Sequence, residues 1–316
     1  MSDSKTIIVT GVNGFVGHHL SRKLHELGHK VIGVGYDAAP TDRNKDSIDQ
    51  YVKCDMTKAS DVQALDLTKV DGVIHLAGLA NVGMSFDKPA EFISSNTAMV
   101  INLLQHAMEQ KSEANFVVIS SGAVYDGKQP MPITEDEGVL THNSPYAISK
   151  LATEYLTEYY ASRGIKCVIT RPFNHVGPGQ GPGFLVPDLA FQLQKVKSGE
   201  ISEVIVGNLD TKRDYTDARD VVDAYIAIAT SQNAPKERIY NVCSGTSRSG
   251  REILDLLIKS FKFDTPPKIT VDEKKLRPND PQDIRGSSDR LRNEYNWKPT
   301  IPLDQTISDF VAGLNQ

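Results

Sequence analysis

Residues 5–24 read KTIIVTGVNGFVGHHLSRKL, and this segment sets the architecture expected for the rest of the chain. The Ile-Ile-Val run at residues 7–9 is short, apolar and β-branched, which is typical of a buried parallel strand. Gly11, Gly14 and Gly17 then follow at three-residue steps into a helical pattern of apolar residues. When a strand is followed by a glycine turn and then a helix, the free backbone N–H groups and the positive end of the helix dipole point at the same place. A pyrophosphate fits at that point.

We expect each of these glycines to have a different structural role. Gly11 permits the tight turn, Gly14 lets the backbone approach the phosphates, and Gly17 lets the helix pack closely on the strand. The spacing is a variant of G-x-G-x-x-G, so it predicts a dinucleotide site, with a ligand-free βα turn as the alternative. No Gly-Lys-Ser/Thr sequence follows the glycines, which argues against a nucleoside triphosphatase.

The composition is that of a globular protein without a strong charge signal. The 316 residues carry a formal net charge of −5, which gives no electrostatic reason to expect nucleic acid or a membrane surface as a partner. Cys54, Cys167 and Cys243 are far apart and form no C-x-x-C motif, so we predict neither disulfides nor a metal site. Because the chain shows no signal peptide and no apolar run of membrane-spanning length, we expect a cytoplasmic protein.

Two aspartates follow predicted strands where an adenosine would bind. Asp37 comes just after a strand at residues 30–35, two positions later than the acid that usually binds the ribose 2′-hydroxyl. The first arginine after that strand is Arg43, so NAD is favoured over NADP, and both remain open. Asp55 ends a third strand, where it can meet the adenine amino group. Either aspartate can also be a plain turn residue.

The next predicted strand, at residues 70–78, runs into small residues that would let the second ribose of a dinucleotide pass close to the backbone. His75 lies inside this apolar strand and is more simply a core histidine than a catalyst. A long helix is predicted over 91–110, and Asn96 interrupts its apolar stripe.

A hydroxyl, a phenol and an amine follow in an order that points to proton transfer. Ser121 comes directly after the apolar strand at 116–119, at the carboxyl edge where ligands bind in parallel sheets. Ser144-Pro145 predicts the start of a helix, and Tyr146 and Lys150 share one face of it because they are four residues apart. An ammonium beside a phenol should lower the tyrosine pKa, which suits a proton-transfer group near neutral pH.

Three features described above occur in this order: Thr10-Gly11-x-x-Gly14-x-x-Gly17, Ser121 and Tyr146-x-x-x-Lys150. In these features the chain resembles the extended short-chain dehydrogenase/reductase family. Members of this family act mostly on nucleotide sugars. The resemblance implies an α/β fold: a Rossmann-type, doubly wound parallel sheet of seven strands with a smaller C-terminal α/β substrate domain. The implied dinucleotide-binding domain covers residues 1–172 with a return at 218–242, and the implied nucleotide-sugar domain covers 173–217 and 243–316.

The resemblance also implies two sets of site residues. The catalytic set is Ser121, Tyr146 and Lys150, with Asn96 as a fourth member. The set that contacts the cofactor is Gly11, Asn13, Gly14, Phe15, Val16, Gly17, Asp37, Asp55, Met56, Leu76, Ala77, Gly78, Tyr146, Lys150 and Pro172.

Four segments are similar to one branch of that family, the GDP-mannose 4,6-dehydratases and GDP-4-keto-6-deoxy-mannose reductases. They are RPFNHVGPGQ (171–180), GFLVPD (183–188), VGNLDTKRDYTDARDVV (206–222) and LRPND (276–280). We expect 172–183 to be a long shaped loop, since its glycines and prolines exclude helix and strand. The similarity implies a substrate set of Ser121, Asn174, Val186, Lys195, Arg213 and Arg277. The alternative for Arg213 and Arg277 is a surface salt bridge.

The same branch offers a choice between two reactions. Dehydratases place a carboxylate just after the catalytic Ser/Thr, whereas this chain has Gly122 and Ala123 there. Without that proton donor we predict the reductase reaction, a reduction of the C4 keto group of a nucleotide-linked 4-keto-6-deoxy sugar by NAD(P)H. A nucleotide-sugar 4-epimerase or 4-dehydrogenase is the nearest alternative, and a non-catalytic dinucleotide-binding regulator is a further one. The resemblance also implies a homodimer through a four-helix bundle of the helices at 91–110 and 144–163.

Overall fold

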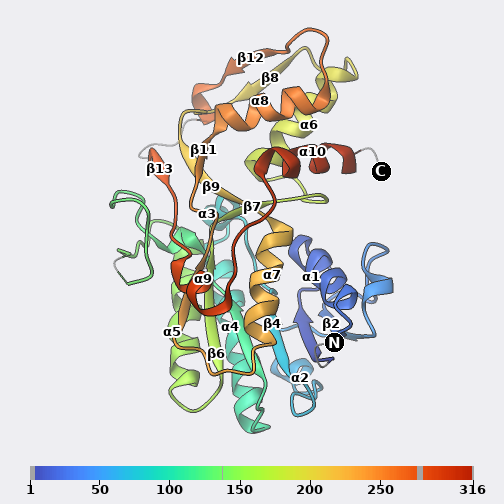
Figure 1. Ribbon diagram of the computed structural model, residues 1–316, viewed down its shortest axis with the longest axis vertical. Coiled ribbons are helices and arrows are strands. Elements are labelled where there is room, and N and C mark those ends of the chain that lie inside the picture. The colour runs from blue at the N-terminus through green and yellow to red at the C-terminus, as the bar shows by residue number, and fades with distance from the viewer. Residues whose placement is uncertain (1–3, 137, 276–279, 315–316) are drawn as a thin grey trace.

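A seven-stranded parallel sheet forms the base of the molecule in the computed structural model, which describes residues 4–136, 138–275 and 280–314 (Figure 1). Its order is β10-β6-β5-β4-β1-β2-β3, and every neighbouring pair is parallel. The strands are β1 (Thr6–Thr10), β2 (Lys30–Gly35), β3 (Gln50–Lys53), β4 (Gly72–His75), β5 (Asn115–Ile119), β6 (Cys167–Pro172) and β10 (Ile239–Val242). Because the chain winds outward from β1 in both directions, the order reverses between β1 and β4, where such sheets bind ligands. The predicted Rossmann-type sheet is confirmed.

Helices cover both faces of this sheet (Figure 1). One face carries α1 (Phe15–Glu26), α7 (Ala218–Ala229) and α9 (Asp289–Tyr295), whose buried side chains share one core cluster with β1 and β10. The other face carries α2 (Ala59–Val62), α4 (Pro89–Glu109) and α5 (Pro145–Ala161), and α3 (Val82–Asp87) lies near the start of α4. Since both faces are covered, the strands read as continuous apolar runs rather than alternating ones.

A second, smaller domain stands above the carboxyl edge of the sheet, in the upper part of Figure 1. It contains two small sheets, three longer helices and a separate apolar core. One sheet joins β7 (Asn174–Val176), β9 (Lys212–Asp217), β11 (Ser247–Ser249) and β13 (Asp283–Ile284), and the other joins β8 (Glu203–Val206) and β12 (Lys268–Val271). The helices are α6 (Leu185–Lys197), α8 (Gly250–Phe261) and α10 (Leu303–Gly313). Short 3-10 turns are η1 (Lys45–Ser47), η2 (Gly122–Val124) and η3 (Glu273–Lys275).

The structure differs from the sequence prediction at two places. The loop expected over 172–183 contains a short strand, β7, which forms because β9 offers it a parallel edge. The range 243–316 does not stay in the second domain, since Leu291 of α9 and Trp297 lie in the core of the Rossmann face. The Trp297 indole donates a hydrogen bond to the backbone oxygen of Asp220 at 2.9 Å, which fixes this return.

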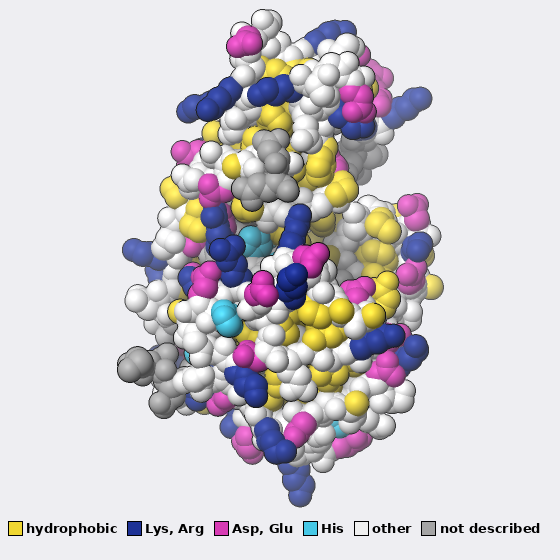
Figure 2. Space-filling view, turned by 90° about the vertical axis from the view of Figure 1, so that its right-hand side faces the viewer, with side chains coloured by type: hydrophobic (Ala, Val, Ile, Leu, Met, Phe, Trp, Pro, Cys, Tyr) yellow, Lys and Arg dark blue, Asp and Glu magenta, His cyan; other side chains and the backbone are white. Residues whose placement is uncertain are grey.

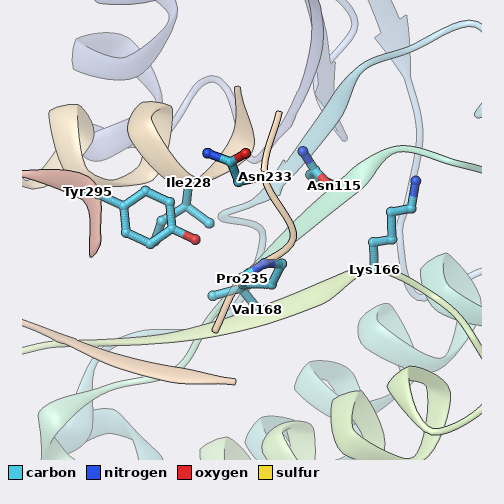
Figure 3. A pocket seen from close by; sticks show the side chains of 7 residues that line it. All are labelled: Asn115, Lys166, Val168, Ile228, Asn233, Pro235 and Tyr295. Carbon is cyan, nitrogen blue, oxygen red and sulfur yellow. The ribbon is translucent and has the colours of Figure 1, made fainter. Parts of the chain in front are cut away.

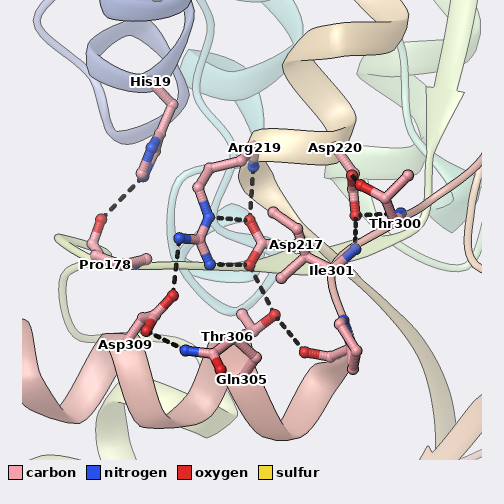
Figure 4. A network of polar contacts seen from close by, with 11 residues as sticks. His19, Pro178, Asp217, Arg219, Asp220, Thr300, Ile301, Gln305, Thr306 and Asp309 are labelled. Carbon is pink, nitrogen blue, oxygen red and sulfur yellow. Dashed lines mark hydrogen bonds and ion pairs between the residues drawn. The ribbon is translucent and has the colours of Figure 1, made fainter.

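A buried carboxylate joins the two domains at the first turn of α7 (Figure 4). Asp217 caps α7 by accepting from the Arg219 backbone N–H, and it also accepts from the Arg219 side chain and from the Thr306 hydroxyl of α10. Arg219 in turn pairs with Asp309 of α10 at 2.8 Å. Asp217 is thus the N-cap residue of α7.

Side chains of both charge signs are interspersed over the surface shown in Figure 2, and the surface is indented between the upper and lower parts of the molecule. No helix within the described ranges combines the length and the apolar character needed to cross a bilayer.

Candidate active site

The glycine turn between β1 and α1 is as closely packed as the sequence predicts. Gly11 has a φ of +68°, and a Cβ built on it would lie 2.8 Å from the Ala77 backbone nitrogen. A Cβ on Gly17 would lie 2.4 Å from the Val12 carbonyl oxygen, so α1 packs directly on the turn. Gly14 caps α1 without a side chain. The amide groups of the first helical turn, which no α-helix satisfies internally, therefore face outward beside a bare backbone. This is the cradle that a dinucleotide pyrophosphate requires.

The predicted adenosine end lies beside this turn. The Asn13 side-chain amide donates to the Asp37 carboxylate at 2.8 Å and to the Ala39 carbonyl at 3.1 Å. The Tyr51 hydroxyl donates to the Asp37 backbone oxygen at 3.0 Å and fills the space over Gly35, the last residue of β2. A side chain at 35 would collide with Tyr51, so the carboxylate at this strand end is supplied by Asp37.

The remaining predicted cofactor residues lie at the carboxyl ends of the neighbouring strands or in the first turn of α1. Asp55 follows β3 and accepts from the backbone and hydroxyl of Thr57, while the buried Met56 follows it. Leu76, Ala77 and Gly78 follow β4, and Pro172 ends β6. Phe15 and Val16 open α1, and the Phe15 ring stacks on His175 with centroids 6.2 Å apart.

The three residues predicted for proton transfer meet at the carboxyl end of β5. Ser121 begins the η2 turn directly after β5, and its hydroxyl accepts from the Ala123 backbone N–H at 3.1 Å. Ser144 caps α5 as predicted, which starts the helix so that Tyr146 and Lys150 both point toward the sheet and are buried. The Lys150 ammonium donates to the Ile119 carbonyl oxygen, at the end of β5, at 2.8 Å.

The electrostatics of this cluster correct one expectation. Burial raises the pKa of Tyr146 above its ordinary value, and a hydrogen bond with Ser121 opposes that rise only in part. The predicted lowering of the tyrosine pKa by the lysine is therefore wrong, because burial disfavours the charged phenolate. Burial lowers the pKa of Lys150 to about 8, and Glu154 acts in the opposite direction. The phenol keeps its proton near neutral pH, as a general acid must.

Asn96 lies beside Lys150 and shapes the loop after β4. Its side-chain oxygen accepts from the Leu79 backbone N–H at 2.8 Å, and its nitrogen donates to the Leu79 carbonyl and to the Ser149 hydroxyl. The same side-chain oxygen and the Lys150 ammonium both lie next to Gly78. Within this structure Asn96 ties the β4 loop to α5, so it positions the cluster through its neighbours.

His75 is a buried core histidine, as predicted. Its Nδ1 lies 2.8 Å from the Thr10 hydroxyl, and burial lowers the pKa of His75 to about 3. A cavity of about 10 Å³, close to the size that one water molecule needs, separates it from Lys150 and Asn96. The neutral imidazole thus lines this small cavity together with Lys150 and Asn96.

The residues predicted to bind the substrate are spread over the second domain. Asn174 is exposed on β7, and Val186 is buried in the apolar core of that domain. Lys195 pairs with Glu200 at 2.8 Å on the surface. The Arg213 guanidinium is ion-paired with Asp280 and donates to two carbonyl oxygens, those of Lys212 and Pro281. Arg277 lies outside the described residues.

A second cavity of about 10 Å³ lies at the opposite end of the sheet (Figure 3). Asn115, the first residue of β5, lines it together with Lys166, Val168 and Tyr295. Since Ser121 follows the other end of β5, this cavity is remote from the catalytic cluster, and its volume admits no more than a water molecule.

Sequence reasoning missed the residues that hold the cluster from below. Thr10 accepts from the Ala77 backbone N–H at 3.2 Å, which joins the glycine turn to the loop after β4. Glu154, one helical turn beyond Lys150, and Arg171 of β6 form a buried ion pair under Ser121. No local sequence signal marks either feature, because each contact joins residues of separate elements.

The chain is similar to known proteins along nearly its whole length. Residues 7–243 match the model of the NAD dependent epimerase/dehydratase family. The chain is 31% identical over 307 residues to the GDP-6-deoxy-D-mannose reductase of Pseudomonas aeruginosa, covering 96% of this chain and 95% of that protein. It is 28% identical to UDP-glucose 4-epimerase 2 of Arabidopsis thaliana, covering 97% and 94%.

Two solved structures are similar throughout. RMD from Pseudomonas aeruginosa complexed with NADPH superposes with a TM-score of 0.82 at 30% identity, covering 98% of each chain. The UDP-glucose 4-epimerase of Thermus thermophilus in complex with NAD superposes with a TM-score of 0.83 at 26% identity, covering 98% of this chain and 99% of that one. The chain belongs to the NAD dependent epimerase/dehydratase family, and it is an NAD(P)-dependent enzyme of the extended short-chain dehydrogenase/reductase type.

Proposed function

We propose that this enzyme reduces the C4 keto group of a nucleotide-linked 4-keto-6-deoxy sugar, with a GDP-sugar as the favoured substrate. The observation that carries the proposal is the convergence of the Tyr146 phenol, the Ser121 hydroxyl and the Lys150 ammonium beside the glycine turn. A bound NADH or NADPH supplies the hydride. Tyr146 donates its proton to the carbonyl oxygen as negative charge develops there, and Ser121 holds that oxygen by a hydrogen bond. Lys150 would hold the nicotinamide ribose and keep positive charge near the phenol.

Reduction fits this site better than dehydration. A dehydratase needs an acid near the departing 6-hydroxyl, and the η2 turn after Ser121 carries none. A Cβ on Gly122 would lie 3.0 Å from the Phe173 ring, so a side chain at that position would require the ring to shift. Ala123 supplies only a methyl group. The buried, protonated phenol suits proton donation in the reductive direction.

A 4-epimerase or 4-dehydrogenase that uses the same three residues is the second candidate. The similarity of this chain to UDP-glucose 4-epimerases over nearly its whole length supports this second candidate. An epimerase retains its dinucleotide and shows no net oxidation of added NAD(P)H.

For the cofactor we favour NAD over NADP. Asp37 presents its carboxylate beside the turn that would hold the pyrophosphate, held there by Asn13. A carboxylate at this place accepts from a ribose 2′-hydroxyl and repels a 2′-phosphate.

We also propose the assignments that follow from family membership. The substrate contacts are Ser121, Asn174, Val186, Lys195, Arg213 and Arg277, and the cofactor contacts are those named above. The chain forms a homodimer through α4 and α5, whose outer faces expose Ile101, Ile148, Tyr155 and Tyr159. The setting is the cytoplasm.

The test is an assay of the purified enzyme with GDP-, dTDP- and UDP-linked 4-keto-6-deoxy sugars, each with NADH and with NADPH. The proposal predicts that one reduced dinucleotide is oxidised for each GDP-sugar reduced. Turnover of 4-hydroxy sugars by the protein as purified, with tightly bound NAD and without added reductant, would instead establish the epimerase.

A further inference from the structure

A buried ion pair lies directly below the catalytic cluster. The Arg171 guanidinium of β6 donates to both carboxylate oxygens of Glu154 on α5, from Nε at 2.9 Å and from Nη2 at 2.6 Å. Both side chains are almost fully buried, with exposed fractions of 4% for Arg171 and 6% for Glu154. This two-point contact fixes the orientation of both groups as well as their separation.

The same carboxylate also holds the residue before the catalytic serine. The hydroxyl of Ser120 donates a short hydrogen bond to Oε1 of Glu154, the oxygen that already accepts from Arg171. Ser120 links β5 to Ser121, and Glu154 lies one helical turn beyond Lys150 and two beyond Tyr146. One carboxylate therefore connects the strand end that carries the serine with the helix that carries the phenol and the amine.

Arg171 extends the network to the far side of the η2 turn. Its Nη1 donates to the Tyr125 hydroxyl at 2.8 Å, and that hydroxyl donates to the Asn241 side-chain oxygen of β10 at 2.8 Å. Ser120 precedes Ser121, and Tyr125 follows the turn that Ser121 begins. The segment that carries the catalytic serine is thus held at both ends by groups that meet at the Glu154–Arg171 pair.

We propose that Glu154 is a positioning residue of the reaction, which holds Ser121 in register with Tyr146 and Lys150 through its shared contacts with Ser120 and Arg171. This inference rests on the proposed function. Buried ion pairs contribute little to stability compared with apolar side chains of the same volume, so stability alone gives no strong reason for one at this place. The geometry supplies another reason, since small displacements of reacting groups cost rate steeply.

The charges around Lys150 give the proposal a second readout, the titration of the Lys150 amine, which is independent of the melting temperature. His75 faces the ammonium from β4, and Tyr146 and Glu154 face it from its own helix. Glu154 is the group among these that favours the charged amine, and Arg171 from β6 faces Glu154 in turn. Replacing the carboxylate by an amide would therefore lower the pKa of Lys150 below its value of about 8.

The test compares Glu154→Gln with Glu158→Gln, the same substitution one turn further along α5. Glu158 is a matched control because it is half-exposed and lies 3.8 Å from Arg238, far from the cluster. For Glu154→Gln we expect kcat to fall roughly 10-fold to 100-fold with little change in KM. In the protein without substrate, the Lys150 side-chain NMR signal, assigned from its loss in Lys150→Met, should titrate about one pH unit lower than in wild type. Glu158→Gln should match wild type in both measurements.

The milder variant Ser120→Ala covers the case in which Glu154→Gln does not fold. It removes one hydrogen bond to Glu154 and leaves the ion pair intact, so kcat should fall about 3-fold to 10-fold while the melting temperature falls by only a few degrees. If Glu154→Gln lowers only the melting temperature, and turnover and the Lys150 titration stay as in wild type, the pair is structural and the proposal is wrong. An unchanged kcat in folded Ser120→Ala also overturns it. If wild type itself reduces no keto sugar, the proposed function has failed, and the NMR titration still tests the link between Glu154 and Lys150.

Discussion

Replacing Gly11 by alanine should weaken dinucleotide binding and destabilise the fold by more than backbone strain alone explains. Two costs act at this position. A φ of +68° lies in the left-handed region, which costs about 1–2 kcal/mol for an alanine. The new Cβ would also lie 2.8 Å from the Ala77 nitrogen and 3.1 Å from the Leu76 carbonyl carbon, both backbone atoms that cannot rotate away. Moving the loop after β4 to relieve this overlap costs about 1–3 kcal/mol more.

Gly28 provides the matched control. Its φ of +80° imposes a similar left-handed strain, but a Cβ there would meet nothing within 4 Å. Gly28→Ala should therefore lower the free energy of unfolding by about 1–2 kcal/mol, and Gly11→Ala by about 2–5 kcal/mol. Urea unfolding gives both values, and the fluorescence of bound NADH or NADPH gives the affinity. Equal losses of stability in the two variants, or wild-type affinity in Gly11→Ala, would refute the reasoning.

Three further perturbations test other parts of the structure. Asp37→Ser removes the carboxylate that follows β2, so the ratio of kcat/KM for NADPH to kcat/KM for NADH should rise about 10-fold or more. An unchanged ratio would show that Asp37 does not select the cofactor. Tyr155→Glu places a charge on the most exposed apolar side chain of α5, which is 68% exposed. It should convert the proposed dimer to monomers in sedimentation, whereas Val271→Glu in the second domain should not. His75 has a folded pKa of about 3 against 6.5 unfolded, so the unfolded chain binds more protons between these values. The free energy of unfolding should consequently fall as the pH drops below about 6.5, more gently in His75→Gln, and identical pH profiles would contradict a neutral buried His75.

The fold was predictable because its main signals are local. The apolar strands, the glycine spacing and the Ser144 cap each reside in a few consecutive residues. The structure places β1 and α5 within a residue or two of the predicted bounds. The short strand β7 could not be predicted, since its residues become a strand only by pairing with β9, about forty positions later. The return of Trp297 to the Rossmann core depends in the same way on the distant carbonyl of Asp220.

In the site, too, the features set by neighbouring residues could be predicted, and the features set by residues distant in the sequence could not. The positions of Ser121, Tyr146 and Lys150 follow from strand ends and helix periodicity, and they meet as predicted. Their electrostatics did not follow from spacing, because the pKa of Tyr146 depends on how much protein surrounds it rather than on which residue lies four positions away. The links from Glu154 to Ser120 and Arg171 were hidden for a similar reason, since they join three separate elements.

In the proposed reaction the enzyme transfers a hydride to C4 of a keto sugar while the Tyr146 phenol supplies the proton. The most direct measurement supplies GDP-4-keto-6-deoxy-mannose and NADH or NADPH that carries deuterium at the transferable position, and follows the product by mass spectrometry and NMR. We expect a single deuterium at C4 of the sugar, one oxidised dinucleotide per product, and a rate roughly 10²–10⁴ lower in Tyr146→Phe with cofactor binding retained. A product without deuterium, or Tyr146→Phe turning over at the wild-type rate, would contradict it.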